Sequence, residues 1–452
     1  MPTALLWFRR DLRLADHPAL LAAVDAAGPD GTVLPVFVFD DRLWGPSGAP
    51  RRRFLLDCLA VLGADTGGAL VLRHGDPARV VPQLATEVGA RSVHVTADAG
   101  PYGRRRDAAV EQALGDVPLV RTGSPYAVAP GRVTKRDGTP FQVFSPFARA
   151  WREHGWHSPA QRPADVRWLP GVPSHDPPPA PDLDGVRLPP AGEAAAHEAW
   201  ARFRDERLSG YAEGRNTPGT GGTSRMSAYL KYGCLHPRSL LADLAGDDSE
   251  AARRYTDELA WRDFYADVLW HRPDSAREYL KPELQAMGYD SGPDAEELVR
   301  AWETGRTGFP IVDAGMRQLL GEAYVHNRVR MIVASFLVKD LHQEWTRGAR
   351  YFMRHLVDGD LASNNHGWQW VAGTGTDASP YYRVFNPVTQ GKKFDPDGSY
   401  VKRWVPELRD LDPRYVHEPW TAPTGVPAGY PEPIVDHAAE RQVALDRYHR
   451  VR

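Results

Sequence analysis

Aromatic and polar side chains recur at helical spacing in the second half of this 452-residue chain. Glu258 and Trp261 are three residues apart, and Asn327 and Met331 are four apart. Residues at these spacings share one face of a helix, so each pair places a carboxyl or amide group beside a large soft side chain. Taken singly, each pair is more typical of a core edge than of a binding site.

The same pattern returns nearer the end of the chain. Asn364 and Trp368 are again four residues apart, whereas Trp368 and Trp370 are two apart and point to different sides of a helix. Basic residues are interleaved with these aromatic side chains, namely Arg328, Arg330, Arg383, Lys392 and Lys393. Ordinary surface charge explains each of them singly, but the combination is typical of sites that hold phosphates and stack bases.

Several other kinds of chemistry are weakly supported or excluded. The Gly-rich run 219–222 does not follow a predicted strand, and the chain has no P-loop, no H-E-x-x-H pair and no serine nucleophile elbow. We interpret that run as a loop before a helix capped by Thr223 and Ser224. Two cysteines, Cys58 and Cys234, are too few for a disulfide framework or a thiolate zinc site, so we expect no metal and a reducing compartment.

Composition sets the scale on which charge can act. The 55 Lys and Arg residues against 58 Asp and Glu give a net charge of −3, so a partner drawn to a globally basic protein is not indicated. Any nucleic-acid binding must therefore come from a local patch. The 14 tryptophans are more than core filling usually requires, and they make aromatic chemistry the feature to explain.

The elements that must position these residues differ between the two ends of the chain. Five short apolar runs alternate with helical or loop segments: 4–8, 33–40, 69–74, 91–97 and 118–121. This alternation predicts an α/β N-terminal domain, residues 1–127, with a doubly wound parallel sheet of the Rossmann-like type. Ligands of such sheets lie beyond the carboxyl ends of the strands, where Arg9, Arg10, Asp40, Asp41 and Asp98 fall.

A Pro-rich segment then separates this domain from a helical one. Residues 128–192 are expected to form an interdomain linker, and residues 193–452 an all-α C-terminal domain. The apolar run 331–338 predicts a helix buried on all sides. No secretory signal and no apolar stretch of ~20 residues is found, so we expect a cytoplasmic protein without membrane association.

The motifs together resemble the photolyase/cryptochrome family over nearly the full length, and within it the class I cyclobutane pyrimidine dimer photolyases. The matching runs are WFRRDLR at 7–13, GTSR at 222–225, ELAWR at 258–262, TGFPIVD at 307–313, HNRVRM at 326–331, DGDLASNN at 358–365, WQW at 368–370 and FNP at 385–387. Their order makes the resemblance very specific. It agrees with the fold class predicted from the residues.

The resemblance implies a noncovalent FAD in the helical domain, which in its reduced form absorbs light and passes an electron to the dimer. Asn364 would face the flavin N5 atom, and Arg330 would form an ion pair with Asp358 against the ring, with Asp360 nearby. The remaining cofactor contacts would come from hydroxyl, backbone and neighbouring groups: Tyr211, Thr223, Ser224, Arg225, Met226 and Ser227. Hydroxyl and backbone N–H groups at the start of a helix are suited to bind phosphates.

The resemblance also implies UV-damaged DNA as the partner of a monomeric enzyme. Trp261 and Trp370 would flank the pyrimidine dimer, and Glu258 would form a hydrogen bond with its base edge. Asn327 and Met331 would line the pocket. Backbone phosphates would be held by three arginines: Arg328, Arg383 and Arg215. Photolyases are among the enzymes that extrude their target bases from the duplex, and poorly stacked damaged bases make this step easier.

An electron relay is implied as well, with one departure from the family pattern. Trp368 and Trp345 match its two inner tryptophans, but Tyr289 stands near the position of the outer one. An oxidised tyrosine usually loses its proton, so we predict slower or rerouted reduction of the flavin by light. His366 is a second departure, since glycine is common there.

A light-harvesting antenna is expected in the N-terminal domain. The run 98–104 and Lys231 resemble the members that bind 8-hydroxy-5-deazaflavin, so we predict this chromophore near Asp98 and Lys231. Methenyltetrahydrofolate is the alternative.

The resemblance favours light-driven repair of cyclobutane pyrimidine dimers, with a cryptochrome-like blue-light receptor as the alternative. The residues implied in repair, Glu258, Asn327, Met331 and both flanking tryptophans, are present. A six-four photolyase is disfavoured because that branch has two histidines where this chain has His326 and Asn327.

Overall fold

The computed structural model describes residues 1–376 and 382–451. These residues form two compact units. The first comprises residues 1–182, 189–205 and 224–273, and the second comprises residues 183–188, 206–223 and 274–452, apart from the undescribed positions. The domain boundaries predicted from the sequence, after residues 127 and 192, divide the chain differently and stay predictions.

The first unit is built on a five-stranded parallel sheet in the order β3-β2-β1-β4-β5. The strands are β1 (Thr3–Phe8), β2 (Thr32–Phe39), β3 (Val71–His74), β4 (Ala90–Val95) and β5 (Leu119–Arg121). Every residue of β1 and β2 is buried, which explains why these runs are apolar throughout rather than alternating. The predicted strands and the doubly wound parallel sheet are confirmed.

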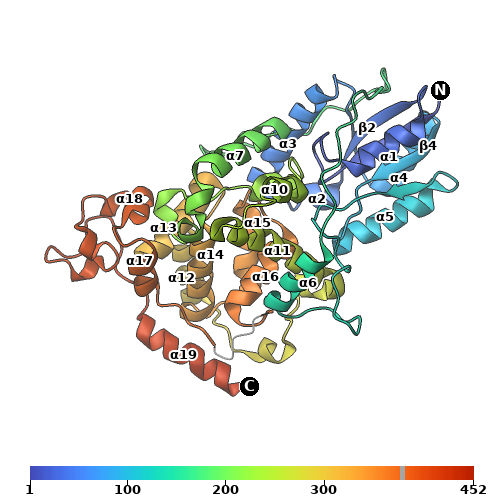
Figure 1. Cartoon of the computed structure of the whole chain (residues 1–452). Helices are drawn as coiled ribbons and strands as arrows, with labels where there is room; N and C mark the ends of the chain where they lie inside the picture. Colours follow the sequence, from blue (N-terminus) through green and yellow to red (C-terminus); the bar gives the residue numbers. More distant parts are fainter. Residues whose placement is uncertain (377–381, 452) are drawn as a thin grey trace. The chain divides into compact units, whose positions relative to one another are not determined.

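Helices cover both faces of this sheet. Between successive strands run α1 (Pro18–Ala27), α3 (Ala49–Asp65), α4 (Pro77–Glu87) and α5 (Pro101–Leu114) (Figure 1). Right-handed crossovers place α1 and α3 on one face and α4 and α5 on the other, because the strand order reverses at β1 and β4. The carboxyl ends of β1 and β4 therefore border the crevice in which such folds bind ligands.

The first unit also holds helices from later in the chain: α6 (Phe144–His154), α7 (Glu193–Glu206), α9 (Ser227–Tyr232), α10 (Pro237–Asp243) and α11 (Glu250–His271). The side chain of Ser249 caps α11 by accepting from the amide of Ala252. The predicted helix cap at Thr223 and Ser224 is wrong, since α9 begins only at Ser227. Arg225 lies in the left-handed region with φ of 55°, so the chain turns between these residues and the helix.

The second unit is helical. Its main helices are α12 (Pro293–Glu303), α13 (Pro310–Glu322), α14 (Asn327–Ser335), α15 (Trp345–His355), α16 (Leu361–Ala372), α17 (Pro387–Phe394), α18 (Ser399–Trp404) and α19 (His437–Arg450). The run 331–338 is largely buried, as predicted, but it is not one α-helix: α14 passes at residue 336 into a π-helical turn, Phe336–Asp340. In the part of the chain that the structure describes, no helix is both long and apolar enough to span a bilayer.

Helices α15 and α16 pack closely at one glycine. A Cβ atom at Gly348 would lie 2.1 Å from the ring of Trp368 and 2.6 Å from a methyl group of Leu337. Only glycine leaves room for the indole at this crossing. On α16 itself, by contrast, a Cβ atom at Gly367 would meet nothing within 4 Å.

We predict that Gly348→Ala destabilises the protein by ~1–3 kcal/mol, the cost of forcing extra volume into a packed core. The matched change Gly367→Ala should stabilise it by ~0.5–1 kcal/mol, because it removes glycine from an open helix position. Urea unfolding of both variants measures the two free energies. Equal effects of the two changes would contradict this description of the α15–α16 contact.

Candidate functional site

One face of α16 holds the irregular segment 275–280 in place, in which Ser275, Ala276 and Tyr279 are buried. Asn365 Nδ2 donates to the carbonyl of Ala276 at 2.5 Å. Gln369 Nε2 donates to the carbonyls of Ser275 and Glu278 at 2.9 and 3.0 Å, and its Oε1 accepts from the amide of Leu280 at 3.0 Å. Three carbonyls and one amide of segment 275–280 thus find their hydrogen-bond partners in side chains of α16. The sequence analysis missed Gln369, which sits inside the WQW motif.

His366 belongs to the same arrangement. Its Nε2 atom lies 2.9 Å from Ser275 Oγ, and its Nδ1 atom lies 2.8 Å from the carbonyl oxygen of Ala362. The ring is fully buried, and burial lowers the pKa of His366 to about 4. The departure at this position therefore joins α16 to segment 275–280 through a neutral imidazole.

A different face of α16 carries Asn364 and Trp368. Asn364 Nδ2 donates to the carbonyl of Ala349 on α15 at 3.1 Å and to Asn365 Oδ1 at 2.9 Å. Trp368 is buried and meets the ring of Phe352 edge-on at 5.0 Å between centroids. Asp360, predicted beside the flavin, caps the helix by accepting from the amides of Ala362 and Ser363.

An ion pair between a half-buried arginine and a buried aspartate lies in the same unit. Arg330 Nη2 is 2.8 Å from Asp358 Oδ2, and Arg330 Nε donates to the carbonyl of Val325 at 2.7 Å. The pairing predicted for these two residues is present. The second carboxylate oxygen, Asp358 Oδ1, is buried without a hydrogen-bond partner among the described residues.

Trp370 and Arg383 form a candidate surface for DNA. The indole of Trp370 is half-buried, and the guanidinium carbon of the exposed Arg383 lies 5.3 Å from its ring centre. Lys339 Nζ donates to the carbonyl of Arg383 and so restrains its backbone. An aromatic face beside a cation suits a base and its phosphate.

Arg328, predicted to bind a phosphate, is held by two contacts within the protein. Its Nη2 atom donates to Asn216 Oδ1 at 2.7 Å, and its guanidinium lies 4.4 Å from the ring centre of Phe394. Asn327 is exposed at the first turn of α14, and Met331 packs against the core one turn later. The predicted shared face of α14 is therefore present, with Arg328 braced beside it.

The other predicted cofactor residues fall in both units. Tyr211 is buried in the second unit, with the guanidinium of Arg215 5.8 Å from its ring centre, and Thr223 also belongs there. Four residues belong to the first unit: Ser224, Arg225, Met226 and Ser227. Ser224 Oγ lies 2.8 Å from the hydroxyl of Tyr255, whereas Met226 is buried and Ser227 exposed.

Glu258 and Trp261 lie on α11 of the first unit, both half-buried. One ring face of Trp261 is covered by Phe144, whose ring is parallel to it within 7° at 3.7 Å. The sequence analysis missed Phe144. Stacking of a base on that face requires Phe144 to move.

Trp345 has a tyrosine neighbour that the sequence analysis also missed. The ring of Tyr279 meets that of Trp345 edge-on, with 6.1 Å between centroids. Tyr289, the predicted outer relay member, bonds to Tyr279 through their hydroxyl oxygens at 2.8 Å. Tyr279 had no periodic signal in the sequence, because it lies in the irregular segment held by α16.

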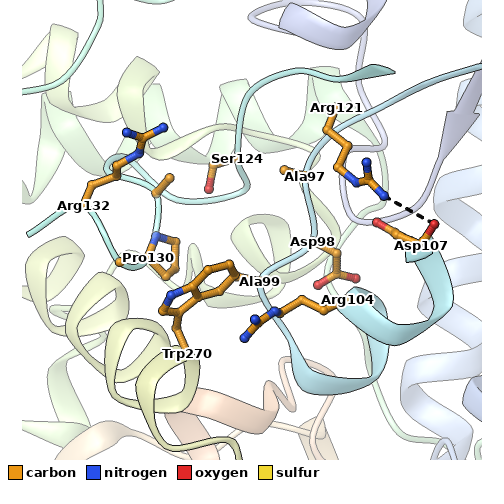
Figure 2. A pocket seen from close by; sticks show the side chains of 12 residues that line it. Ala97, Asp98, Ala99, Arg104, Asp107, Arg121, Ser124, Pro130, Arg132 and Trp270 are labelled. Atoms are coloured by element: carbon orange, nitrogen blue, oxygen red, sulfur yellow. Dashed lines mark hydrogen bonds between the residues drawn. The ribbon is translucent and has the colours of Figure 1, made fainter. Parts of the chain in front are cut away.

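A cavity of about 570 Å³ opens in the first unit, beyond the carboxyl ends of β4 and β5 (Figure 2). Asp98 lines it, together with three arginines, Arg104, Arg121 and Arg132, and with Trp270. Arg104 lies 3.9 Å from the ring centre of Trp270. The wall depends on Gly131, where a Cβ atom would lie 2.6 Å from Trp270 Nε1.

Charges behind this cavity are tightly paired. Arg106 contacts both Asp98 at 3.2 Å and Asp107 at 2.8 Å, and Arg9 contacts Asp107 at 2.7 Å. Burial alone would raise the pKa of Asp98, but Arg106, Arg9 and Arg10 outweigh it and lower that pKa. The carboxylate is therefore charged.

Lys231, the other predicted antenna residue, is not among the residues that line this cavity. Its carbonyl accepts from Arg10 Nε at 3.5 Å, and Arg10 in turn acts on the charge of Asp98.

The fold and site together define a protein with a doubly wound ligand-binding unit and a helical unit rich in buried tryptophan. Residues 4–165 match the family described as DNA photolyase, and residues 255–450 match the FAD binding domain of DNA photolyase. The chain belongs to the photolyase/cryptochrome family, as its motifs predicted.

Known relatives match along almost the whole chain. The deoxyribodipyrimidine photo-lyase of Halobacterium salinarum is 38% identical over 485 residues, which cover 99% of both chains. A crystal structure described as a bacterial class III photolyase from Agrobacterium tumefaciens is 38% identical, with a TM-score of 0.93 over 100% of this chain and 98% of that one. A Synechocystis cryptochrome is 26% identical, with a TM-score of 0.89 over 99% of each chain.

The helical unit fits the FAD that this family implies. A buried carboxylate oxygen that lacks a donor, Asp358 Oδ1, suits a ligand that carries N–H or hydroxyl groups. Arg330 holds the neighbouring oxygen in place. The donor and acceptor set is therefore compatible with a flavin nucleotide.

We predict that His366 makes stability fall as the pH is lowered from 6.5 to 4. The unfolded chain binds a proton near pH 6.5 while the buried ring does not, so protonation favours unfolding by up to about 3 kcal/mol. Unfolding free energies of wild type and His366→Asn, measured across this range, test it. The stability advantage of wild type should shrink as the pH falls.

The exposed His157 provides the control, since His157→Asn should leave the pH dependence unchanged. A difference between wild type and His366→Asn that stays constant over the whole range would refute the assignment.

Proposed function

We propose that the protein repairs cyclobutane pyrimidine dimers in UV-damaged DNA with light as the energy source and FAD as its cofactor. The observation that carries this proposal is the Arg330–Asp358 pair, whose buried Asp358 Oδ1 has no partner among the described residues, in a segment that matches the FAD binding domain of DNA photolyase. The names of the full-length relatives support the same reaction. When bound, reduced FAD supplies an excited electron to the dimer.

The chain's own groups hold the cofactor. Arg330 and Asp358 bind against the flavin ring, and Asn364 presents a neutral amide to the N5 atom, which favours a reduced anion because it forces no protonation. Tyr211 and Asp360 support the site from the same unit. Thr223, Ser224, Arg225, Met226 and Ser227 contribute the contacts to the phosphates and ribitol.

Substrate recognition uses aromatic and basic side chains. Trp370 stacks on the extruded dimer while Arg383 binds a flanking phosphate, an arrangement that their 5.3 Å contact supports. Trp261 packs on the dimer, and Glu258 bonds to a base edge. Asn327 and Met331 line the pocket, and Arg328 and Arg215 bind further phosphates.

We propose that Trp368 and Trp345 relay electrons to oxidised flavin in light. Both are buried, one on each of the packed helices α16 and α15. Short steps between buried indoles avoid solvent. The sequence analysis predicts Tyr289 as the next member.

The antenna is proposed to be 8-hydroxy-5-deazaflavin in the cavity lined by Asp98, with Lys231 acting from nearby; methenyltetrahydrofolate is the alternative. Three arginines and the face of Trp270 suit a flat anionic ring. The class I assignment stays a prediction beside the similarity to a class III photolyase. We also propose that the enzyme acts as a monomer in the cytoplasm.

Mass spectrometry of the chromophore released from the native protein tests the antenna. We expect the mass of 8-hydroxy-5-deazaflavin, together with its loss in Trp270→Ala at unchanged FAD content, because this change removes one wall of the cavity. A folate mass would refute the deazaflavin and support the alternative.

Light-dependent repair of an oligonucleotide with one thymine dimer tests the function. Chemically reduced protein should restore the oligonucleotide in light and leave it unchanged in darkness. Arg383→Ala should raise the DNA concentration needed for half-maximal repair by about 5–150-fold, the range of ~1–3 kcal/mol for a charge-assisted contact.

Arg409→Ala is the matched control, because it removes an equally exposed arginine that is not part of the proposed DNA surface. Flavin that is bound and reducible, without repair in light, would overturn the proposal and favour a blue-light receptor of the cryptochrome type.

A further inference from the structure

Tyr279 contacts the outer of the two relay tryptophans. It is 3% exposed, and its ring meets Trp345 edge-on at 6.1 Å between centroids. Tyr289 bonds to the hydroxyl of Tyr279 and packs against the core. The contacts therefore connect Trp345 to Tyr279 and Tyr279 to Tyr289.

A proton acceptor is already bonded to Tyr279. Its hydroxyl donates to Glu344 Oε1 at 3.3 Å. Since a phenol has one proton, the contact with Tyr289 must then be donated by Tyr289. The carboxylate is itself oriented by Thr346, whose Oγ1 donates to Glu344 Oε2 at 2.8 Å. Burial, together with the neighbouring Glu344 carboxylate, raises the pKa of Tyr279, so the resting phenol keeps its proton.

Trp345, by contrast, has no bonded proton acceptor: its Nε1 atom is buried without a hydrogen-bond partner among the described residues. An indole that has lost an electron there keeps its proton and its positive charge in a dry core, which is costly. Transfer of an electron from Tyr279 to Trp345, with the tyrosine proton moving to Glu344, removes that charge from the core.

Hydrogen bonds hold the segment that carries Tyr279 in place. Its segment is bonded on both sides to Gln369 of α16, through the carbonyl of Glu278 and the amide of Leu280. The helix that carries Trp368 thus also positions Tyr279.

We propose that Tyr279 is the terminal electron donor of the light-driven relay and that Glu344 Oε1 receives its proton. This rests on the proposed relay through Trp368 and Trp345. Each step moves one electron inward: from Trp368 to photoexcited oxidised flavin, from Trp345 to Trp368, and from Tyr279 to Trp345. The O–H bond of Tyr279 breaks as a bond to Glu344 forms. A thiol in solution then gives one electron to the tyrosyl radical and its own proton to water, and Glu344 returns its proton to the oxygen of Tyr279.

Transient absorption and electron paramagnetic resonance of the FAD-loaded protein detect the radical directly. In wild type, a flash should yield a neutral tyrosyl radical whose formation slows in D2O. Tyr279→Phe should reduce its yield at least about tenfold, which corresponds to ~1.4 kcal/mol. Glu344→Gln should reduce it in the same direction because an amide does not accept the proton, and it keeps the side chain's shape if Tyr279→Phe folds poorly.

Two tyrosine controls separate this assignment from its competitors. Tyr289→Phe should keep the radical on Tyr279. Tyr351→Phe changes another tyrosine of the same core, near Trp302 rather than Trp345, and should change nothing. A radical that survives Tyr279→Phe and disappears in Tyr289→Phe, or an undiminished yield in Glu344→Gln, overturns the proposal.

The relay and the repair function are tested separately in the same samples. Trp345→Phe should abolish the tyrosyl radical, and an unchanged radical in that variant refutes the relay on which Tyr279 depends. Repair by chemically reduced Tyr279→Phe should equal that of wild type, because reduced flavin needs no electron from the relay. Loss of repair in that reduced variant would contradict a role confined to the relay.

Discussion

The hydrogen bonds between α16 and segment 275–280 are the constraint on which the helical unit depends. The turn 273–276 accepts the amides of Arg277 and Glu278 at the carbonyl of Asp274. The carbonyls of Ser275, Ala276 and Glu278 and the amide of Leu280 are instead bonded by side chains of α16. Unpaired backbone groups in such a place cost ~1–3 kcal/mol each. Asn365 and Gln369 remove that cost by bonding to these backbone groups, and His366 adds a bond to the side chain of Ser275.

Two faces of α16 have different roles. The face of α16 that anchors the segment is fully used by structural bonds, while Asn364 and Trp368 lie on another face against α15. A single rigid element thus positions a group proposed to face the flavin, an inner relay tryptophan and, through the anchored segment, Tyr279. In the first unit, the neighbouring carboxyl ends of β4 and β5 set Asp98 and Arg121 at the edge of a cavity.

Much of the fold could be predicted from the sequence because buried strands and helices have recognisable patterns of apolar residues. The strands of the parallel sheet are continuous apolar runs, and the 3.6-residue period of α11 and α16 places paired residues on one face. The cap assigned to Thr223 and Ser224 failed because a hydroxyl before a helix is only a local signal, which the left-handed Arg225 overrides. Likewise, one π-helical turn interrupts an apolar run that reads as a single helix.

The partners of the site residues were beyond the reach of sequence patterns. Tyr279 and Glu344 are 65 residues apart and meet only through tertiary packing, and Phe144 covers Trp261 from a different element. The spacing argument could place Tyr289 near the relay, but it could not show which tyrosine touches Trp345. Contacts between irregular segments have no period to detect.

Hydrogen exchange followed by mass spectrometry tests the central claim, that side chains of α16 lock segment 275–280. The account predicts that the amide of Leu280 exchanges as slowly as the core of α16, and that Gln369→Met speeds its exchange while leaving α13 protected. Fast exchange of this amide in the wild-type protein, or no change in the variant, would contradict the account.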